Sequence, residues 1–126
     1  MPARIVFLDD NKDLRELMRD ILESKLNVAC TCFGSVMEFT KHGEEVLRAK
    51  VAILDINLGQ DVPSGMDAFR WLTKQGFQGK VVFFTGHARI YLQAELDDGS
   101  GTEVLEKPVD LSKLISAIER ALNGNP

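Results

Sequence analysis

Short apolar runs alternate along this chain with segments in which apolar residues recur at a helical spacing. This alternation constrains the fold more than any other feature of the sequence. Continuous apolar runs of this kind are typical of strands that are buried on both faces of a sheet. Strands that alternate with helices form βαβ units, whose right-handed crossovers give a parallel sheet with helices on both faces. We therefore predict an α/β fold, a (βα)5 chain with strands over residues 4–8, 27–33, 51–54, 81–84 and 102–106.

The first two predicted helices begin at residues that commonly cap helices. Asp13 and Glu16 have the spacing of a capping box, although the helix could begin a residue or two earlier, and the apolar stripe that follows continues to Leu22. Ser35 is expected to open the second helix, which Gly43 weakens in its middle, so that its far end stays open.

Three further helices are expected after the third, fourth and fifth strands. One covers residues 66–75 and is closed by Gly76, and another covers residues 87–96. The last begins after Asp110, an expected N-cap, and ends at Gly124.

The composition indicates one globular domain over residues 1–126, with its core at residues 4–122. Hydrophobic residues make up 44% of the chain and charged residues 27%, which argues against intrinsic disorder. The net charge of −4 makes direct nucleic-acid binding by this domain unexpected, because such binding depends on neutralising phosphates. No apolar run approaches the roughly 20 residues of a membrane span. The first residues lack a signal-peptide pattern, so we expect a cytoplasmic protein.

Cys30 and Cys32 are too few for a disulfide framework, and on a strand they would face the same side of the sheet. We expect two small residues that are buried or half-buried, in preference to a redox or metal role. Trp71, in the third predicted helix, is expected to pack in the core in preference to anchoring a partner.

Polar and charged side chains come directly after four of the five predicted strands. Asp9 and Asp10 follow the first strand, and Asp55 follows the third. Thr85 comes at the end of the fourth strand and Lys107 at the end of the fifth. For the expected strand order, 2-1-3-4-5, ligands bind outside the carboxyl ends of the strands. Because those ends meet at one edge of a parallel sheet, the five residues are expected to converge on one site.

The residue types at this expected site suit phosphoryl chemistry. Three carboxylates packed together repel one another and raise a pKa unless a cation intervenes. Hard oxygen ligands with open positions for water suit Mg²⁺ better than zinc. Lys107 would add a second positive charge, so that a phosphoryl group could be neutralised between metal and lysine. Thr85 could donate a hydrogen bond to that group, and the central carboxylate of Asp55 could attack phosphorus.

Five motifs stand out along the chain, and four of them contain the candidate site residues: 6–10 (VFLDD), 53–58 (ILDINL), 64–68 (SGMDA), 83–88 (FFTGHA) and 105–108 (LEKP). Together these segments resemble the receiver domain of two-component response regulators, and the resemblance runs from about residue 4 to residue 122. It implies a flavodoxin-like, doubly wound fold. It also implies a signalling domain that is modified and changes its binding, and not an enzyme with turnover.

The resemblance implies that Asp55 accepts a phosphoryl group from the phosphohistidine of a sensor histidine kinase or a phosphotransfer protein. A downstream effector protein or domain would then read the change, and a homodimer is compatible with the family. Asp10, Asp55 and the backbone carbonyl of Asn57 would bind Mg²⁺ directly, and Asp9 would reach the metal through water.

The resemblance also gives roles to residues of the fourth and fifth strands. Lys107 would pair with the phosphoryl group, and Thr85 would shift toward it on phosphorylation. The peptide bond between Lys107 and Pro108 would be cis, as in family members.

Val104 departs from the family pattern, which usually has Tyr or Phe three residues before the lysine. In the family that ring moves inward as the threonine shifts, and valine has no ring to move. Our hypothesis is that Asp55 is phosphorylated normally, and that the domain signals weakly or through surfaces other than the fourth helix and fifth strand.

The loop after Asp55 is longer than the common family pattern, with Gly59 in place of the usual proline and Pro63 further on. A tolerated surface insertion is the favoured interpretation, and partner choice or access to phosphorus is the alternative. In the family, the positions held here by Asn57 and His87 tune the loss of the phosphoryl group. His87 would either orient a water molecule or cap the next helix.

Two other functions stay open at the level of the sequence. A small phosphatase of the haloacid-dehalogenase type also forms an aspartyl phosphate, but it needs Asp-x-Asp after its first strand. Here Asp9 and Asp10 are adjacent and Asn11 follows. A degenerate receiver that binds partners without phosphorylation is favoured by Val104 and disfavoured by the intact set of site residues.

Overall fold

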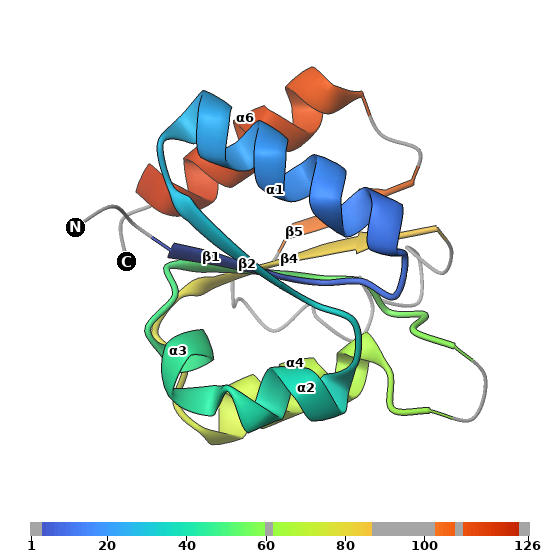
Figure 1. The fold of residues 1–126 in the computed structure, drawn as a ribbon. Helices are drawn as coiled ribbons and strands as arrows, with labels where there is room; N and C mark the ends of the chain where they lie inside the picture. The colour runs from blue at the N-terminus through green and yellow to red at the C-terminus, as the bar shows by residue number, and fades with distance from the viewer. Residues whose placement is uncertain (1–3, 60–61, 87–102, 108–109, 124–126) are drawn as a thin grey trace.

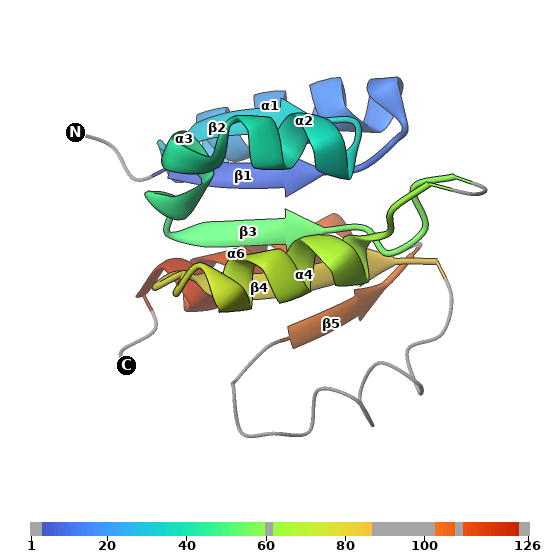
Figure 2. The same ribbon diagram turned by 90° about the horizontal axis from the view of Figure 1, so that it is seen from below.

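A five-stranded parallel sheet forms the centre of the computed structural model, which describes residues 4–59, 62–86, 103–107 and 110–123 (Figure 1). The strands are β1 (Arg4–Leu8), β2 (Ala29–Phe33), β3 (Val51–Leu54), β4 (Lys80–Thr85) and β5 (Glu103–Glu106). Their order in the sheet is β2-β1-β3-β4-β5, which confirms the predicted order. All neighbouring pairs are parallel, so the strands end at the same edge (Figure 2).

Helices cover both faces of this sheet. The first face carries α1 (Lys12–Leu26) and α6 (Leu111–Asn123), and the second carries α2 (Val36–Lys41), α3 (Gly43–Leu47) and α4 (Gly65–Lys74) (Figure 1). The helix expected over residues 87–96 falls outside the described residues. The doubly wound, flavodoxin-like α/β architecture is confirmed. None of the helices in the described ranges is long and apolar enough to cross a membrane.

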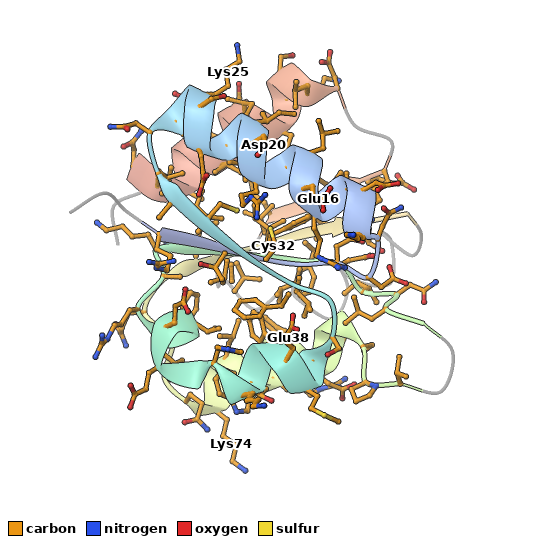
Figure 3. The ribbon with its side chains drawn as sticks, viewed as in Figure 1. Glu16, Asp20, Lys25, Cys32, Glu38 and Lys74 are labelled. Atoms are coloured by element: carbon orange, nitrogen blue, oxygen red, sulfur yellow. The ribbon has the colours of Figure 1, made fainter. Side chains whose placement is uncertain are left out.

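Two hydrophobic clusters, one on each face of the sheet, form the core of the domain. Because side chains alternate along a strand, neighbouring residues of β4 belong to different clusters. Val82 and Phe84 pack toward α1 and α6, whereas Val81 and Phe83 pack toward α2, α3 and α4. Charged side chains such as Lys74 lie on the outer surfaces of the helices (Figure 3).

The helix α1 takes the earlier of the two starts that the sequence left open, and not the capping box at Asp13 and Glu16. Asn11 is the N-cap, and its side-chain oxygen accepts a hydrogen bond from the backbone N–H of Leu14. Asp13 lies inside the first turn, where its negative charge interacts favourably with the helix dipole.

The strand β2 begins at Ala29, two residues later than predicted, because of the way in which α1 ends. Asn27 caps the C-terminus of α1 in the left-handed conformation, with φ of 53°, so residue 27 cannot begin a strand.

The predicted helix after Ser35 is interrupted. Ser35 caps α2 and accepts a hydrogen bond from the N–H of Glu38, as predicted, but His42 leaves helical geometry and α3 begins at Gly43. Gly43 lies against the indole of Trp71, and a Cβ at this position would come within 3.2 Å of the ring.

Trp71 and the two cysteines have the packing roles that the sequence predicts. The indole of Trp71 is half-buried and meets the ring of Phe39 edge to face, with centroids 6.1 Å apart. Cys30 is buried and Cys32 half-buried, both belong to the cluster under α1, and both are free thiols. Figure 3 shows Cys32 in the layer between β2 and α1.

The predicted cap of the last helix is confirmed, and α4 has a cap that the sequence reading missed. The carboxylate of Asp110 accepts hydrogen bonds from the backbone N–H and hydroxyl of Ser112. Ser64 and Asp67 form a reciprocal capping box at the start of α4. This box fixes the point at which the long loop after β3 returns to the second face of the sheet.

Candidate functional site

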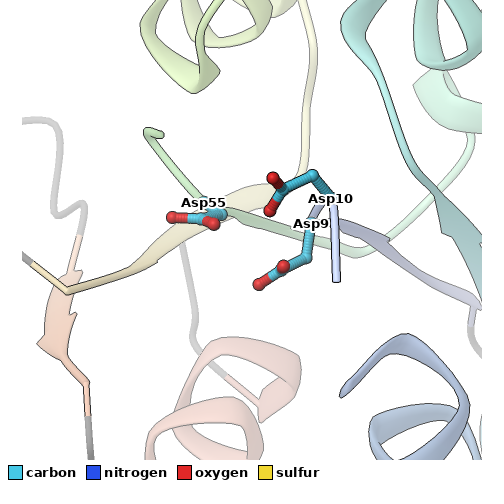
Figure 4. A group of neighbouring side chains, drawn as sticks. All are labelled: Asp9, Asp10 and Asp55. Atoms are coloured by element: carbon cyan, nitrogen blue, oxygen red, sulfur yellow. The ribbon is translucent and has the colours of Figure 1, made fainter. Parts of the chain in front are cut away.

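Three carboxylates gather at the carboxyl edge of the sheet, as the strand order requires. Asp9 and Asp10 follow β1 directly, and Asp55 follows the neighbouring strand β3. One carboxylate oxygen from each residue lies within 4.8 Å of the others (Figure 4). Asp9 and Asp55 are buried, with 1% and 4% of their surface exposed, whereas Asp10 is exposed. The cluster therefore has two carboxylates inside the protein and one at its mouth.

The carboxylate of Asp9 has a protein partner for each of its oxygens. Oδ1 accepts a hydrogen bond of 2.9 Å from the backbone N–H of Asn11, and Oδ2 accepts one of 2.7 Å from Lys107 Nζ. Its backbone N–H donates to the carbonyl of Phe33 on β2, and Arg15 donates to its carbonyl. Two hydrogen bonds thus hold the side chain of Asp9, and two more hold its backbone.

Lys107 enters the site from the far side of β4. Its backbone N–H donates to the carbonyl of Thr85 across 2.7 Å, which fixes the residue at the end of β5. Its ammonium lies 2.7 Å from Asp9 Oδ2 and 3.3 Å from Asp55 Oδ2. The side chain is only a quarter exposed. A single cation therefore bridges the two buried carboxylates.

Burial and repulsion dominate the electrostatics of Asp55. Burial first, and then the charge of Asp9, raise the pKa of Asp55 to about 6, although Lys107 and a backbone hydrogen bond from Asn57 act against this shift. Burial lowers the pKa of Lys107, but hydrogen bonds and charge from Asp9 and Asp55 outweigh it, so that pKa lies above its ordinary value. Lys107 offsets only part of the repulsion between the carboxylates.

Gly65 lies directly against the backbone of Asp55, a role that the sequence did not predict for it. The backbone N–H of Asp55 donates to the carbonyl of Leu8, and that of Gly65 donates to the carbonyl of Ile56. A Cβ on Gly65 would lie 2.1 Å from the carbonyl oxygen of Asp55, so only glycine allows α4 to start so close to the site. Nothing in the spacing of one sequence signals such a close approach.

The structure places the remaining predicted site residues as follows. Thr85 is the last residue of β4 and is buried, with 2% of its surface exposed. Asn57 follows Asp55 in the loop, where its side-chain oxygen accepts a hydrogen bond from the N–H of Gly59. Val104 is buried on β5 in register with Phe83. The positions of His87, Pro108, Gln60 and Asp61 lie outside the described residues.

The donor set at this edge fits a hard divalent cation such as Mg²⁺. All three side chains offer carboxylate oxygens, and their mutual distances are short enough for one ion to contact them. The charges support the same conclusion, because two buried carboxylates share one ammonium and the exposed Asp10 adds a third negative charge. A divalent cation would relieve repulsion that Lys107 leaves uncompensated.

The raised pKa of Asp55 predicts a pH-dependent cost to folding in the absence of metal. Because the folded-state pKa of Asp55 lies above the unfolded value, Asp55 contributes stability at low pH. That stability is lost as pH rises from about 4 to about 6. Asp55→Asn should therefore unfold with a free energy larger than that of the wild type by about 1–3 kcal/mol at pH 7.5. Urea denaturation with EDTA at pH 7.5, 6.0 and 4.5 measures the difference, which should shrink as pH falls.

Asp20→Asn is the matched control, because Asp20 is an exposed acid on α1 that does not belong to the carboxylate cluster. Its stability difference from the wild type should stay small at each pH. A difference in the free energy of unfolding between Asp55→Asn and the wild type that does not depend on pH would contradict the electrostatic account. A wild type that is the more stable of the two at pH 7.5 would contradict it as well.

Comparison with known proteins agrees with the geometry of this edge. The response regulator receiver domain family matches residues 5–119. The tetrathionate response regulatory protein TtrR of Salmonella typhimurium is 30% identical over 120 residues, which cover 95% of this chain and 56% of TtrR. The transcriptional regulatory protein FixJ of Azorhizobium caulinodans is 27% identical over 122 residues, which cover 97% of this chain and 55% of FixJ. The chain thus spans about half the length of these relatives.

Solved structures give the same assignment. A response regulator receiver domain protein from Clostridium thermocellum has a TM-score of 0.82 and 26% identity, covering 96% of this chain and 94% of that one. The signal receiver domain of a putative Luxo repressor protein from Vibrio parahaemolyticus shares the fold, with a TM-score of 0.84 and 20% identity over 98% of this chain and 92% of that one. The chain belongs to the response regulator receiver domain family of two-component systems.

Proposed function

We propose that this domain accepts a phosphoryl group on Asp55 from the phosphohistidine of a sensor histidine kinase or a phosphotransfer protein. The reaction depends on Mg²⁺, and phosphorylation changes the binding of a downstream effector protein or domain. The observation that carries this proposal is the position of Asp55, a buried carboxylate with two further acids and the Lys107 ammonium beside it. Asp9 has similar neighbours, but both of its carboxylate oxygens already accept hydrogen bonds from protein groups.

The hydrogen bonds of the site support a division of labour among the metal-binding residues. Both oxygens of Asp9 already accept hydrogen bonds from protein groups, so it is suited to reach a metal through water. Asp10 is exposed at the mouth of the cluster, and together with Asp55 and the backbone carbonyl of Asn57 it would hold the ion directly. When bound, Mg²⁺ supplies positive charge that neutralises the phosphoryl oxygens.

The residues of this chain supply the nucleophile and its surroundings. A carboxylate oxygen of Asp55 attacks phosphorus, the phosphorus–nitrogen bond of the phosphohistidine breaks, and its electron pair stays with the imidazole. Lys107, which lies 3.3 Å from Asp55, transfers its hydrogen bond to an oxygen of the phosphoryl group. Thr85, at the end of the neighbouring strand β4, donates a hydrogen bond from its hydroxyl to another.

The phosphatase alternative is less well supported by the geometry than the receiver function. An enzyme of that kind uses the second acid of Asp-x-Asp as its proton donor, and the residue two positions after Asp9 is Asn11. The side chain of Asn11 caps α1 by accepting a hydrogen bond from Leu14, so it is committed to the helix. The domain therefore undergoes modification and does not turn over a substrate.

The setting of the domain follows from the same proposal. We place it in the cytoplasm as one receiver domain over residues 1–126, where it meets a kinase and does not bind nucleic acid directly. Its relatives TtrR and FixJ are regulatory proteins about twice the length of this chain, so an output through an attached or separate effector is part of the proposal. A homodimer is a further state that phosphorylation could favour.

Phosphorylation of Asp55 is tested with acetyl phosphate and Mg²⁺, followed by intact-protein mass spectrometry. The wild type should gain the mass of one phosphoryl group, and Asp55→Asn should gain none. Lys107→Met should be modified at least tenfold more slowly, because it lacks the ammonium that balances the transferred charge. Asp20→Asn, an exposed acid on α1, should react like the wild type.

Two outcomes would contradict the receiver function. Repeated turnover of phosphate esters would favour the phosphatase. An unmodified wild type, with acetyl phosphate and with a phosphorylated histidine kinase, would favour a binding module that works without phosphorylation.

Val104 predicts a weak response of β5 to phosphorylation. Its side chain is 8% exposed and packs in the cluster on the α2 and α4 face, beside Phe83. Beryllofluoride with Mg²⁺ should therefore shift the amide NMR signals of Asp55 and Thr85 strongly and those of β5 weakly. Val104→Tyr should enlarge the β5 shifts, since it supplies a ring that can change position. Large β5 shifts in the wild type would refute the hypothesis.

A further inference from the structure

Lys107 reaches the two buried carboxylates only by crossing the end of a neighbouring strand. It follows β5, at the edge of the sheet, whereas Asp55 follows β3 and Asp9 follows β1. Strand β4 lies between β5 and β3, so the side chain of Lys107 has to reach across the carboxyl end of β4 to contact Asp55 and Asp9. The side chain beneath this path therefore bears directly on where the ammonium lies.

Phe84 provides that surface. It is the penultimate residue of β4, in register with Leu105 of β5, and its ring belongs to the cluster on the α1 and α6 face. The ammonium of Lys107 lies 5.1 Å from the centroid of this ring. Phe84 is 5% exposed, so water competes little for its face. The preceding residue, Phe83, packs on the opposite face of the sheet.

The ring completes the surroundings of the ammonium. Of the three N–H groups of Lys107, one is directed to Asp9 and one to Asp55. The negative face of an aromatic ring attracts a cation at this distance, more strongly where water is excluded. Phosphorylation of Asp55 has to change its contact with Lys107. Asp9 and the ring of Phe84 are not altered by the reaction, so they remain neighbours of the ammonium.

We propose that Phe84 is a positioning residue for the phosphoryl transfer, which it assists by holding the Lys107 ammonium beside Asp9 and Asp55. This inference rests on the proposed function. The ring does not touch the phosphoryl group. It limits the positions that a flexible lysine side chain can occupy, so that the ammonium is already in place when the phosphoryl group arrives. A residue that only filled the core would have no such effect on Lys107.

NMR of the unmodified wild-type protein tests the geometry without any reaction. A ring beneath the ammonium should shift the ε-methylene protons of Lys107 upfield by its ring current. The shift should disappear in Phe84→Leu and persist in Phe83→Leu, which removes a ring of the same size from the other face of the same strand. A wild-type protein without the upfield shift overturns the proposal, even if Asp55 is phosphorylated normally.

The rate of phosphorylation by acetyl phosphate tests the functional role. Phe84→Leu should react about 3- to 30-fold more slowly than wild type, and Phe84→Tyr, which keeps a ring, should restore most of the rate. Phe83→Leu should react at the wild-type rate, provided that circular dichroism shows both leucine variants to be folded at the assay temperature. Equal rates for the two leucine variants, or no recovery with tyrosine, would show that Phe84 is only part of the core.

Failure of this inference is distinguishable from failure of the proposed function. A wild-type protein in which Asp55 takes no phosphoryl group overturns the proposed function, and this is known before any Phe84 variant is compared. A wild-type protein that is modified normally, with Phe84→Leu equally fast, overturns only the role of Phe84.

Discussion

Two buried carboxylates at the ends of adjacent strands repel each other, and one ammonium holds them in the folded protein. The parallel sheet places Asp9 and Asp55 side by side. A backbone hydrogen bond ties Lys107 to the end of β4, and its ammonium lies within hydrogen-bond distance of both carboxylates. Burial first, and then the charge of Asp9, still raise the pKa of Asp55 to about 6 although Lys107 acts against them. A cluster of carboxylates that repel one another attracts further positive charge, and that charge favours the ionised form of Asp55. The metal binding and the phosphoryl acceptance that we propose would therefore have one electrostatic origin.

The sequence predicts the parts of this arrangement that follow from periodicity. Five apolar runs and the helical repeats between them predict a parallel sheet, and the polar residues after its strands then have to meet at one edge. The order 2-1-3-4-5 was expected from the flavodoxin-like pattern and is confirmed. The parts that it did not predict depend on local geometry. Asn11 caps α1 where Asp13 was expected, since several polar residues in a row can serve as a cap and only backbone conformation decides among them. Gly65 and Phe84 make close approaches between different segments of the chain, which no local sequence pattern records.

The two faces of the sheet have different roles in the site. On the α1 and α6 face, Phe84 lies beneath the Lys107 ammonium and joins the core to the charges of the site. On the α2 and α4 face, Phe83 of β4 and Val104 of β5 lie in register and belong to the same cluster. On that face Gly65 also allows the start of α4 to lie against the backbone of Asp55. Asp55 thus contacts Lys107 through its carboxylate and lies against the start of α4 through its backbone.

The most direct test of the electrostatic account is the Mg²⁺ affinity of Lys107→Met, measured by isothermal titration calorimetry at pH 8. If Lys107 occupies the site as the cation that the carboxylates require, its removal should increase Mg²⁺ affinity by about tenfold, because a positive charge close to the bound ion is lost. Lys25 lies in the last turn of α1, and Lys25→Met should bind Mg²⁺ like the wild type. Unchanged or weaker Mg²⁺ binding by Lys107→Met would show that the carboxylates do not depend on a cation in this way.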